Sequence, residues 1–433
     1  MSAEEPATQH AEALTNWLRL SSGWHFIDAR PQRLGVAVSG GSDSMALLDL
    51  MIWHGGQAGF EVHAVTVDHG LRPEAKQEAL LVAEYCAGRG VSHEVLTWEW
   101  DGKGNLQAQA REARYSLMAD WAVRRGIDYV ALGHTRDDQA ETVVMRLTRM
   151  SGVDGLAGMP GAFERYDVTW VRPLLRHQRD DIRQYLTYQN VSWCDDPSNE
   201  DEAFERVRVR RAAAVLAEVG ITQDTLVGIA DNMQSAKWAL QFYTEREVED
   251  GLVEEDRGDL IIPEAPKEER LIPGEILRRV QIAILQWLSG NPYPPRNQAM
   301  INLVAEMAQA DRHTLFGCMV TRLTDKGSSE SRLRFSREYN AVKDTVSPTN
   351  QLWDGRWRLE GPHDAALEVR ALGKALVECF DWRMTGMPQT SLQASPAVWQ
   401  GNELISAPLA GFSNGWTAKA TGRGNFAQFL LSR

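Results

Sequence analysis

The chain has 433 residues, of which 43% are hydrophobic and 24% charged, so it can form a packed core and is not compositionally disordered. No stretch approaches the roughly 20 apolar residues of a membrane span, and the polar, acidic start MSAEEPATQH differs from a signal peptide. We therefore expect a cytoplasmic protein with no membrane partner. A net charge of −13 argues against a nucleic-acid partner when taken alone, because a basic face is the usual footprint.

The four cysteines are far apart in the sequence and form no C-x-x-C motif. A zinc ribbon, an iron–sulfur site and a dithiol redox motif are therefore all poorly supported. Four small, partly buried thiols in a reducing compartment are the simpler interpretation.

From residue 34 onward, strand-like and helix-like segments alternate along the chain. Strand-like apolar runs span 34–38, 62–67, 93–98 and 129–132, and helix-like segments span 44–53, 74–89, 106–125 and 139–150. This alternation predicts an α/β fold with a doubly wound parallel sheet and helices on both of its faces. Ligands of such sheets lie beyond the carboxyl ends of the strands, where the polar motifs of this chain fall.

Beyond residue 178 the pattern changes. Residues 178–245 are predicted to be mostly helical, and the acidic stretch 245–269 is predicted to be an exposed connector. Later segments contain many short apolar runs with Trp, Gly and Pro, which indicates helical and small α+β C-terminal domains. The predicted domains are an N-terminal catalytic domain at 1–220, a helical linker with a first C-terminal domain at 221–345, and a second, β-rich C-terminal domain at 346–433.

The stretch "VAVSGGSDSMALLDL" places two glycines and several small hydroxyls at the start of a helix. It is not a Walker loop, because the lysine and the G-x-x-x-x-G-K-[ST] spacing are missing. Gly40 and Gly41 let the backbone approach a ligand closely, and the free N–H groups of a helix start attract an anion. A tight turn with a Ser or Asp helix cap is the plain alternative. The combination of a strand, S-G-G-x-D-S and a helix favours a phosphate site.

This loop resembles the pyrophosphate loop of the N-type ATP pyrophosphatases, the PP-loop family. "VDHGLRPEA", "NLQAQAREARY", "GHTRDDQAETVVMRLTRMSGVDGLAGM", "RPLL" and "WCDDPSNEDEAFERVRVRR" then follow in order. Together these motifs are similar to those of tRNA(Ile)-lysidine synthetases, strongly over residues 34–211 and more weakly beyond. Two positions depart from that family's pattern: Thr135 replaces a second histidine, and Val207 replaces an asparagine.

The resemblance implies ATP-dependent ligation of L-lysine to the first anticodon cytidine of tRNA(Ile) with a CAU anticodon. The cytidine is first adenylated and lysine then attacks the same carbon, so pyrophosphate and AMP are released. The product, lysidine, changes codon and amino-acid specificity from Met to Ile. The implied cofactors and partners are ATP as substrate, Mg²⁺, L-lysine and the tRNA. The sequence leaves the oligomeric state open, with a homodimer as one expectation.

Roles in this chemistry are expected for the following residues. A carboxylate beside phosphates needs a bridging cation, so Asp43 is predicted to bind Mg²⁺, with Asp137 as a second ligand or a helix cap. Asp138 and Glu141 are three residues apart, share a helix face and suit a lysine ammonium, whose proton one of them can accept. The predicted catalytic residues are Asp43, Arg114, Asp138 and Glu141. The predicted ATP-binding residues are Ser39, Gly40, Gly41, Ser42, Asp43, Ser44, Asp68, Gly133 and His134.

The run RVRVRR at 206–211 is weighed evenly between a solvated helix face and a site for RNA phosphates. In the second interpretation, tRNA binds Arg206, Arg208, Arg210 and Arg211. Three alternatives to the whole assignment remain open: a tRNA thiolase, which would want paired or persulfide cysteines; a small-molecule amide synthetase, which would not need the arginine runs; and an inactive nucleotide- or RNA-binding module.

Overall fold

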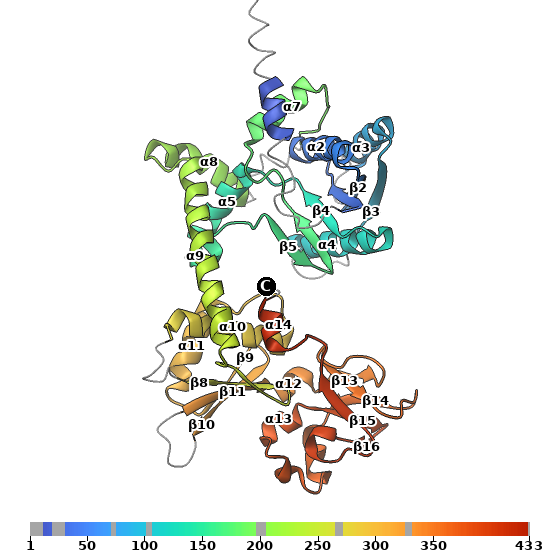
Figure 1. Cartoon of the computed structure of the whole chain (residues 1–433), viewed down its shortest axis with the longest axis vertical. Helices are drawn as coiled ribbons and strands as arrows, with labels where there is room; N and C mark the ends of the chain where they lie inside the picture. The colour runs from blue at the N-terminus through green and yellow to red at the C-terminus, as the bar shows by residue number, and fades with distance from the viewer. Residues whose placement is uncertain are drawn as a thin grey trace, which may run out of the picture. The chain divides into compact units, whose positions relative to one another are not determined.

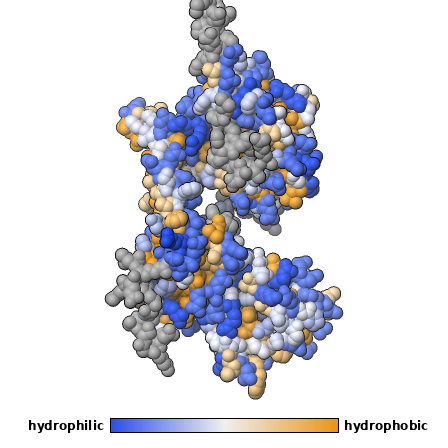
Figure 2. Space-filling view, in the orientation of Figure 1, coloured by the Kyte–Doolittle hydropathy of each residue, from blue (hydrophilic) through white to orange (hydrophobic). Residues whose placement is uncertain are grey.

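The computed structural model describes residues 12–19, 31–70, 75–100, 106–195, 205–264, 272–324 and 331–431 (Figure 1). The chain divides into two compact units, Met1–Lys237 and Trp238–Arg433. The division into three domains expected from the sequence stays a prediction. On the face drawn in Figure 2, hydrophilic residues predominate and hydrophobic ones form scattered patches, as on ordinary protein surfaces.

The first unit contains a six-stranded sheet in the order β3-β2-β1-β4-β6-β5. Its strands are β1 (Arg33–Ala37), β2 (Glu61–Asp68), β3 (Ser92–Thr97), β4 (Tyr129–Leu132), β5 (Ala162–Arg165) and β6 (Val168–Val171). Neighbouring strands pair in parallel from β3 to β6, and β5 alone pairs antiparallel. The predicted doubly wound α/β fold is confirmed.

Helices cover both faces of this sheet. They are α2 (Ser42–Ala58), α3 (Ala75–Arg89), α4 (Leu106–Arg125), α5 (Arg136–Leu147), α6 (Val153–Leu156) and α7 (Arg179–Tyr188). Successive strand residues point to opposite faces, so Val36 packs in the core beneath α2 and α7, whereas Ala37 packs in the core beneath α4. Figure 1 shows α2 and α3 on one side of the sheet and α4 on the other.

Two local features of this unit differ from the sequence prediction. Helix α5 begins at Arg136 rather than at residue 139, because Thr135 and Asp138 form a capping box at its start. The β5–β6 hairpin was not predicted. Its turn uses Tyr166 and Asp167 at φ values of 56° and 57°, a conformation that is more usual for Gly or Asn.

Two further helices follow α7 in the chain: α8 (Glu205–Glu218) and α9 (Gln223–Glu249). In the part of the chain that the structure describes, no single helix is long and apolar enough to cross a membrane. The pair α8 and α9, bent by 100°, meets the length and composition criteria only when the two are taken together.

The second unit begins with a five-stranded antiparallel sheet in the order β7-β8-β11-β10-β9. Its strands are β7 (Glu254–Asp256), β8 (Asp259–Pro263), β9 (Arg312–Leu315), β10 (Cys318–Thr324) and β11 (Ser331–Arg337), and helices α10 (Gly274–Ser289) and α11 (Asn297–Met307) lie between β8 and β9 in the chain. The prediction of an exposed connector at 245–269 is wrong, since Leu260, Ile261 and Ile262 of β8 are buried in this sheet. The strand was not predicted because its apolar run is short and is surrounded by acidic residues.

The remaining elements form two smaller sheets, with the orders β12-β14-β15-β16 and β13-β17. The elements are α12 (Tyr339–Val342), β12 (Ser347–Pro348), β13 (Trp357–Glu360), β14 (Glu368–Ala371), η2 (Gly373–Glu378), η3 (Trp382–Thr385), α13 (Gln389–Gln393), β15 (Pro396–Gln400), β16 (Glu403–Ser406), η4 (Pro408–Ala410), β17 (Thr417–Ala420) and α14 (Phe426–Leu431). Helix α14 returns to the core of the five-stranded sheet, where the Phe426 ring meets Trp287 of α10 edge to face.

Candidate functional site

The loop between β1 and α2 has the geometry of an anion cradle. Gly40 has a φ of +88°, and a Cβ added there would lie 3.1 Å from Cβ of Glu78. The Ser44 hydroxyl accepts a hydrogen bond from the Ser39 N–H at 3.1 Å and donates one to the Gly41 carbonyl at 3.0 Å. Gly41 is the residue before α2, and no side chain caps this helix start. The helix N-terminus therefore keeps its attraction for a phosphate, and this supports the phosphate site over the capped turn.

Gly133, at the end of β4, lies against the first turn of α2. A Cβ at this position would be 3.1 Å from the backbone carbon and oxygen of Asp43 and from Cα of Ser44. The end of β4 can therefore approach the phosphate loop so closely only because residue 133 has no side chain.

Replacing Gly133 with alanine should displace the start of α2 and raise the KM for ATP about tenfold, since sub-ångström shifts in a site are costly. The measurement is pyrophosphate release as a function of ATP concentration. Gly88→Ala is the matched control, because a Cβ at Gly88 of α3 meets nothing within 4 Å. Equal KM values for the two variants would contradict a close-packing role for Gly133.

Arg179, the first residue of α7, joins three carboxylates beside the phosphate loop. Its Nε donates to Oδ2 of Asp43 at 3.0 Å, and its Nη2 lies 3.6 Å from Oδ1 of Asp138. Its backbone N–H donates to Oδ2 of Asp137 at 2.9 Å. The sequence prediction missed Arg179. The only signal for it was its place in the arginine-rich run at 172–183.

The predicted carboxylate pair of α5 lies in the same region, and both side chains are buried. Oδ2 of Asp138 accepts hydrogen bonds from the N–H and the hydroxyl of Thr135, at 2.9 and 3.0 Å. Oε1 of Glu141 accepts one from Nε of Arg210 at 2.5 Å. Oε2 of Glu141 is buried without a hydrogen-bond partner among the described residues. Nε of Arg206 lies 3.9 Å from this oxygen, beyond hydrogen-bond distance, so the oxygen keeps an unused capacity to accept a bond from a ligand.

Burial and neighbouring charge separate the pKa values of the three acids. Burial raises the pKa of Asp43, and the Arg179 guanidinium only partly offsets it. Burial also acts to raise the pKa of Asp138, but Arg179 and the Thr135 N–H outweigh it, so the net shift is downward. Burial raises the pKa of Glu141 despite its bond to Arg210. A carboxylate with a raised pKa is the better proton acceptor for an amine, which favours Glu141 over Asp138 as a base.

His134 is held in one tautomer by Arg172. Nε of Arg172 donates to Nδ1 of His134 at 3.2 Å, so the ring proton of the neutral imidazole is on Nε2. Burial, followed by the charge of Arg172, lowers the pKa of His134 to about 3. His134 is therefore a neutral hydrogen-bond donor throughout the neutral pH range.

This shift makes a prediction about stability. Between an ordinary histidine pKa of about 6.5 and the folded-state value, only the unfolded chain takes up the proton. The free energy of unfolding should therefore fall as pH drops from 6.5 towards 3, by at most about 1.4 kcal/mol per pH unit from this residue. Urea unfolding of His134→Asn at pH 7 and pH 5 should show a weaker loss than the parent chain. The same change at exposed His363 is the control, and an equal effect there would contradict the assignment.

Arg114, predicted to be catalytic, lies on α4, and Asp68, predicted to bind ATP, is the last residue of β2. Arg114 of α4 is close enough to contribute to the lowered pKa of both His69 and His134, whereas Arg111 lies over the Tyr115 ring. Oδ1 of Asp68 accepts the N–H of Gly70 at 2.8 Å, so its carboxylate orders the turn after β2.

The four arginines of the α8 run divide into two pairs. Arg206 lies 3.9 Å from both Asp138 and Glu141, and Arg210 bonds to Glu141. Arg208 and Arg211 are exposed. Val207, at the position of the family's asparagine, is buried. Half of the predicted tRNA-binding run thus contacts the predicted lysine-binding carboxylates, which the sequence analysis did not foresee.

Comparison with known proteins identifies the family. The PP-loop domain family matches residues 11–216. The chain is 45% identical to the tRNA(Ile)-lysidine synthase of Ruegeria pomeroyi over 425 residues, covering 98% of each chain. The chain belongs to the tRNA(Ile)-lysidine synthase family. It is 32% identical to the synthase of Anaplasma marginale, covering 80% of this chain and 72% of that one. It is 35% identical to the synthase of Zymomonas mobilis, and this match covers 65% of this chain and 83% of that one.

The motifs that carried the resemblance to the synthase family are only partly within the structure. The start of the loop after β2 is described, but residues 71–74 are not, and the polar loop at 196–199 also lies outside the described residues. The phosphate loop, the α5 carboxylates and the α8 arginines are all described. The expected roles of these residues in the synthase remain proposals.

Magnesium is the cofactor that the sequence resemblance implied. Across the described residues of this chain, no group of three or more His, Cys, Asp or Glu side chains could hold a metal alone. Mg²⁺ needs less, because one or two carboxylates plus substrate phosphates suffice. Asp43 has the position for this role beside the phosphate loop, although its Oδ1 accepts the Ser42 hydroxyl and its Oδ2 accepts Nε of Arg179. Oδ2 of Asp137 accepts the N–H of Arg179, so a magnesium ion would compete with existing bonds at both residues.

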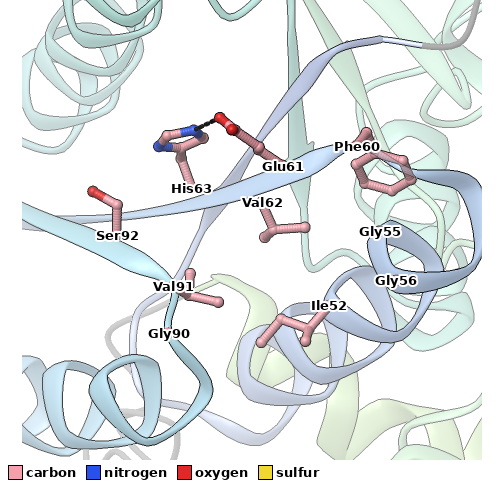
Figure 3. Close-up of a pocket in the computed structure, with 10 residues that line it drawn as sticks. All are labelled: Ile52, Gly55, Gly56, Phe60, Glu61, Val62, His63, Gly90, Val91 and Ser92. Atoms are coloured by element: carbon pink, nitrogen blue, oxygen red, sulfur yellow. Dashed lines mark hydrogen bonds and ion pairs between the residues drawn. The ribbon is translucent and has the colours of Figure 1, made fainter.

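A separate cavity of about 350 Å³ lies at the other end of the sheet (Figure 3). Its lining includes Ile52 of α2, Val62 and His63 of β2, and Val91 and Ser92 at the start of β3. His63 bonds to Glu61 on its rim at 3.4 Å. None of the predicted site residues lines this cavity, so the candidate site is the one at the carboxyl ends of the strands.

Proposed function

We propose that this protein ligates L-lysine to the first anticodon cytidine of tRNA(Ile) with a CAU anticodon, using ATP and forming lysidine through an adenylated cytidine. The observation that carries the proposal is the acidic pair Asp138 and Glu141 beside the phosphate loop. Oε2 of Glu141 is buried, accepts no hydrogen bond from the described residues and lies 3.9 Å from Nε of Arg206. A PP-loop enzyme needs an anion cradle for its pyrophosphate. One that uses a cationic amine also needs negative charge beside the cradle, and buried carboxylates supply it.

In the first step, the cytosine carbonyl oxygen attacks the α-phosphate of ATP, and pyrophosphate leaves into the loop at 39–44. The N–H groups at the start of α2 and the charge of Arg114 stabilise the departing anion. Asp43 would hold a magnesium ion, with Asp137 as a second ligand, and this ion supplies charge neutralisation of the phosphates. We expect the adenosine to rest against His134, a fixed neutral donor, and Asp68.

In the second step, the ammonium of lysine binds between Asp138 and Glu141. Glu141 takes a proton from the side-chain ammonium, and the free amine attacks the activated cytosine carbon and expels AMP. The upward pKa shift of Glu141 brings the base closer to the amine in proton affinity, which favours this transfer. The downward shift of Asp138 keeps a permanent negative charge for binding the ammonium.

The arginines of α8 connect this pocket with the RNA. We propose that Arg206, Arg208, Arg210 and Arg211 contact phosphates of the anticodon loop. Support comes from the exposure of Arg208 and Arg211 and from the placement of Arg206 and Arg210 beside the acids. Guanidinium groups are suited to phosphate oxygens by their forked geometry. The cytoplasmic location and the homodimer expected from the sequence remain predictions.

The test is transfer of radiolabelled lysine into tRNA(Ile) with a CAU anticodon in the presence of ATP and Mg²⁺. We expect ATP-dependent label that resists the mild base which strips aminoacyl esters. Methionine tRNA with the same anticodon and a reaction without ATP are the controls. Pyrophosphate release with a different substrate and no labelled tRNA would keep the ATP site but overturn the RNA chemistry.

A further inference from the structure

Helices α2 and α7 are joined by two polar pairs in the same register. At their N-termini, Asp43 of α2 accepts a hydrogen bond from Arg179 of α7. Six residues later in each helix, Asp49 accepts a hydrogen bond from the Tyr185 hydroxyl. The two helices therefore run in the same direction, side by side, with one pair at the phosphate loop and one deep in the core.

The inner pair is built around a buried carboxylate. Asp49 is only 4% exposed, and it accepts hydrogen bonds from Tyr185 of α7 and Tyr85 of α3 and a bond at 3.1 Å from Arg89 of α3. Burial and then the Asp49 charge raise the pKa of the Tyr185 hydroxyl, so it remains a protonated donor, and Arg19 also faces it. Burial and the Asp49 carboxylate raise the pKa of Tyr85 in the same way. A buried charge with three donors is costly to disturb.

The outer pair depends on how α7 is seated. Asp137 accepts the backbone N–H of Arg179, which fixes where α7 begins. This single bond near the helix axis leaves rotation about that axis to other contacts. Ile182 and Leu186 of α7 pack in the core together with Tyr185, so this buried face sets the approximate rotation of the helix. The Tyr185–Asp49 hydrogen bond adds a directional restraint to that packing, and this restraint refines the rotation of α7 and with it the direction of the Arg179 side chain.

We propose that Tyr185 is a positioning residue for ATP use: its bond to Asp49 holds the rotation of α7 against α2 and thereby keeps Arg179 against Asp43 at the phosphate loop. This inference rests on the proposed role of that loop in binding ATP and is independent of the lysine and tRNA steps.

The structure supplies a matched pair of variants. Tyr85→Phe and Tyr185→Phe each remove one hydroxyl donor from the same carboxylate, and only Tyr185 lies on α7. Tyr185→Phe should raise the KM for ATP and the dissociation constant of ATP about fivefold with less change in kcat, since small misplacements cost affinity and rate. Tyr85→Phe should change both constants less than about twofold, although the loss of a buried hydrogen bond should lower the melting temperature of both variants.

A second comparison tests the route through Arg179. In an Arg179→Ala background, adding Tyr185→Phe should have no further effect on ATP affinity, because the group that it positions is gone. ATP binding is measured directly by calorimetry, so this test does not depend on lysine transfer. If no lysine enters the tRNA, that result contradicts the proposed function and leaves the inference about Tyr185 testable. Should Tyr185→Phe fail to fold, Asp49→Asn takes its place with the same expected change, because its amide offers one acceptor oxygen where Tyr85 and Tyr185 use two.

Two results would overturn the inference. One is an equal loss of ATP affinity in Tyr85→Phe and Tyr185→Phe, which would make Asp49 a stability element alone. The other is a Tyr185→Phe effect of the same size with and without Arg179, which would show that Tyr185 acts by another path.

Discussion

Replacing Glu141 with glutamine is expected to lower lysine incorporation more than about 100-fold, while pyrophosphate release without lysine falls less than about fivefold. The amide keeps the size of the side chain and an oxygen for Arg210, but it loses the negative charge and the ability to accept a proton. Both losses act on the amine step and leave the phosphate loop intact. The measurement is single-turnover lysine transfer beside pyrophosphate release on the same tRNA.

The matched control is Glu84→Gln, an exposed glutamate on α3 away from the carboxylate pair. It should change neither rate by more than about twofold, as for an ordinary surface substitution. The parent enzyme should also gain lysine transfer with rising pH through a value above the usual glutamate pKa, because burial raises the pKa of Glu141. An equal fall of both reactions in Glu141→Gln would assign Glu141 to adenylation or to folding.

The phosphate loop was predictable from the sequence because its physics is local. A strand, two glycines and a helix start are contiguous, so Gly40 and Ser44 could be placed without knowing the rest of the fold. The pair Asp138 and Glu141 was predictable for the same reason, since their spacing defines a common helix face. The earlier start of α5 changed the bounds of the helix but kept this face.

Contacts between distant segments were not predictable in the same way. Arg179 reaches Asp43 across 136 positions of sequence, and nothing in the local pattern distinguishes it from Arg183 one turn later. From the sequence, the arginines of α8 were predicted to bind tRNA and the carboxylates of α5 to bind lysine, so no contact between the two sets was expected. The fold brings Arg210 and Glu141 to 2.5 Å, a contact that depends on how α8 packs against α5.

Arg179→Ala is the second substitution with a large expected effect, a fall of about 100-fold in pyrophosphate release. The guanidinium is the nearest cation to both Asp43 and Asp138, at 3.0 and 3.6 Å. Without it, the two carboxylates repel each other, and the contribution that lowers their pKa values is lost, so both pKa values rise. The acid limb of the pH–rate profile should therefore move to higher pH. Rates between pH 5 and pH 9 at saturating ATP are the measurement.

Arg183→Ala distinguishes this effect from general damage to α7. Arg183 lies on the same helix but pairs with exposed Asp195 at 2.7 Å, an ion pair of the kind that contributes little. It should keep more than about half of the parent rate and an unshifted acid limb. Arg179→Lys retains the charge without the fork, so it should recover part of the rate and most of the pH profile. If Arg179→Ala and Arg183→Ala behaved alike, the cation between Asp43 and Asp138 would have no specific part in the chemistry, and any loss of rate would be general damage to α7.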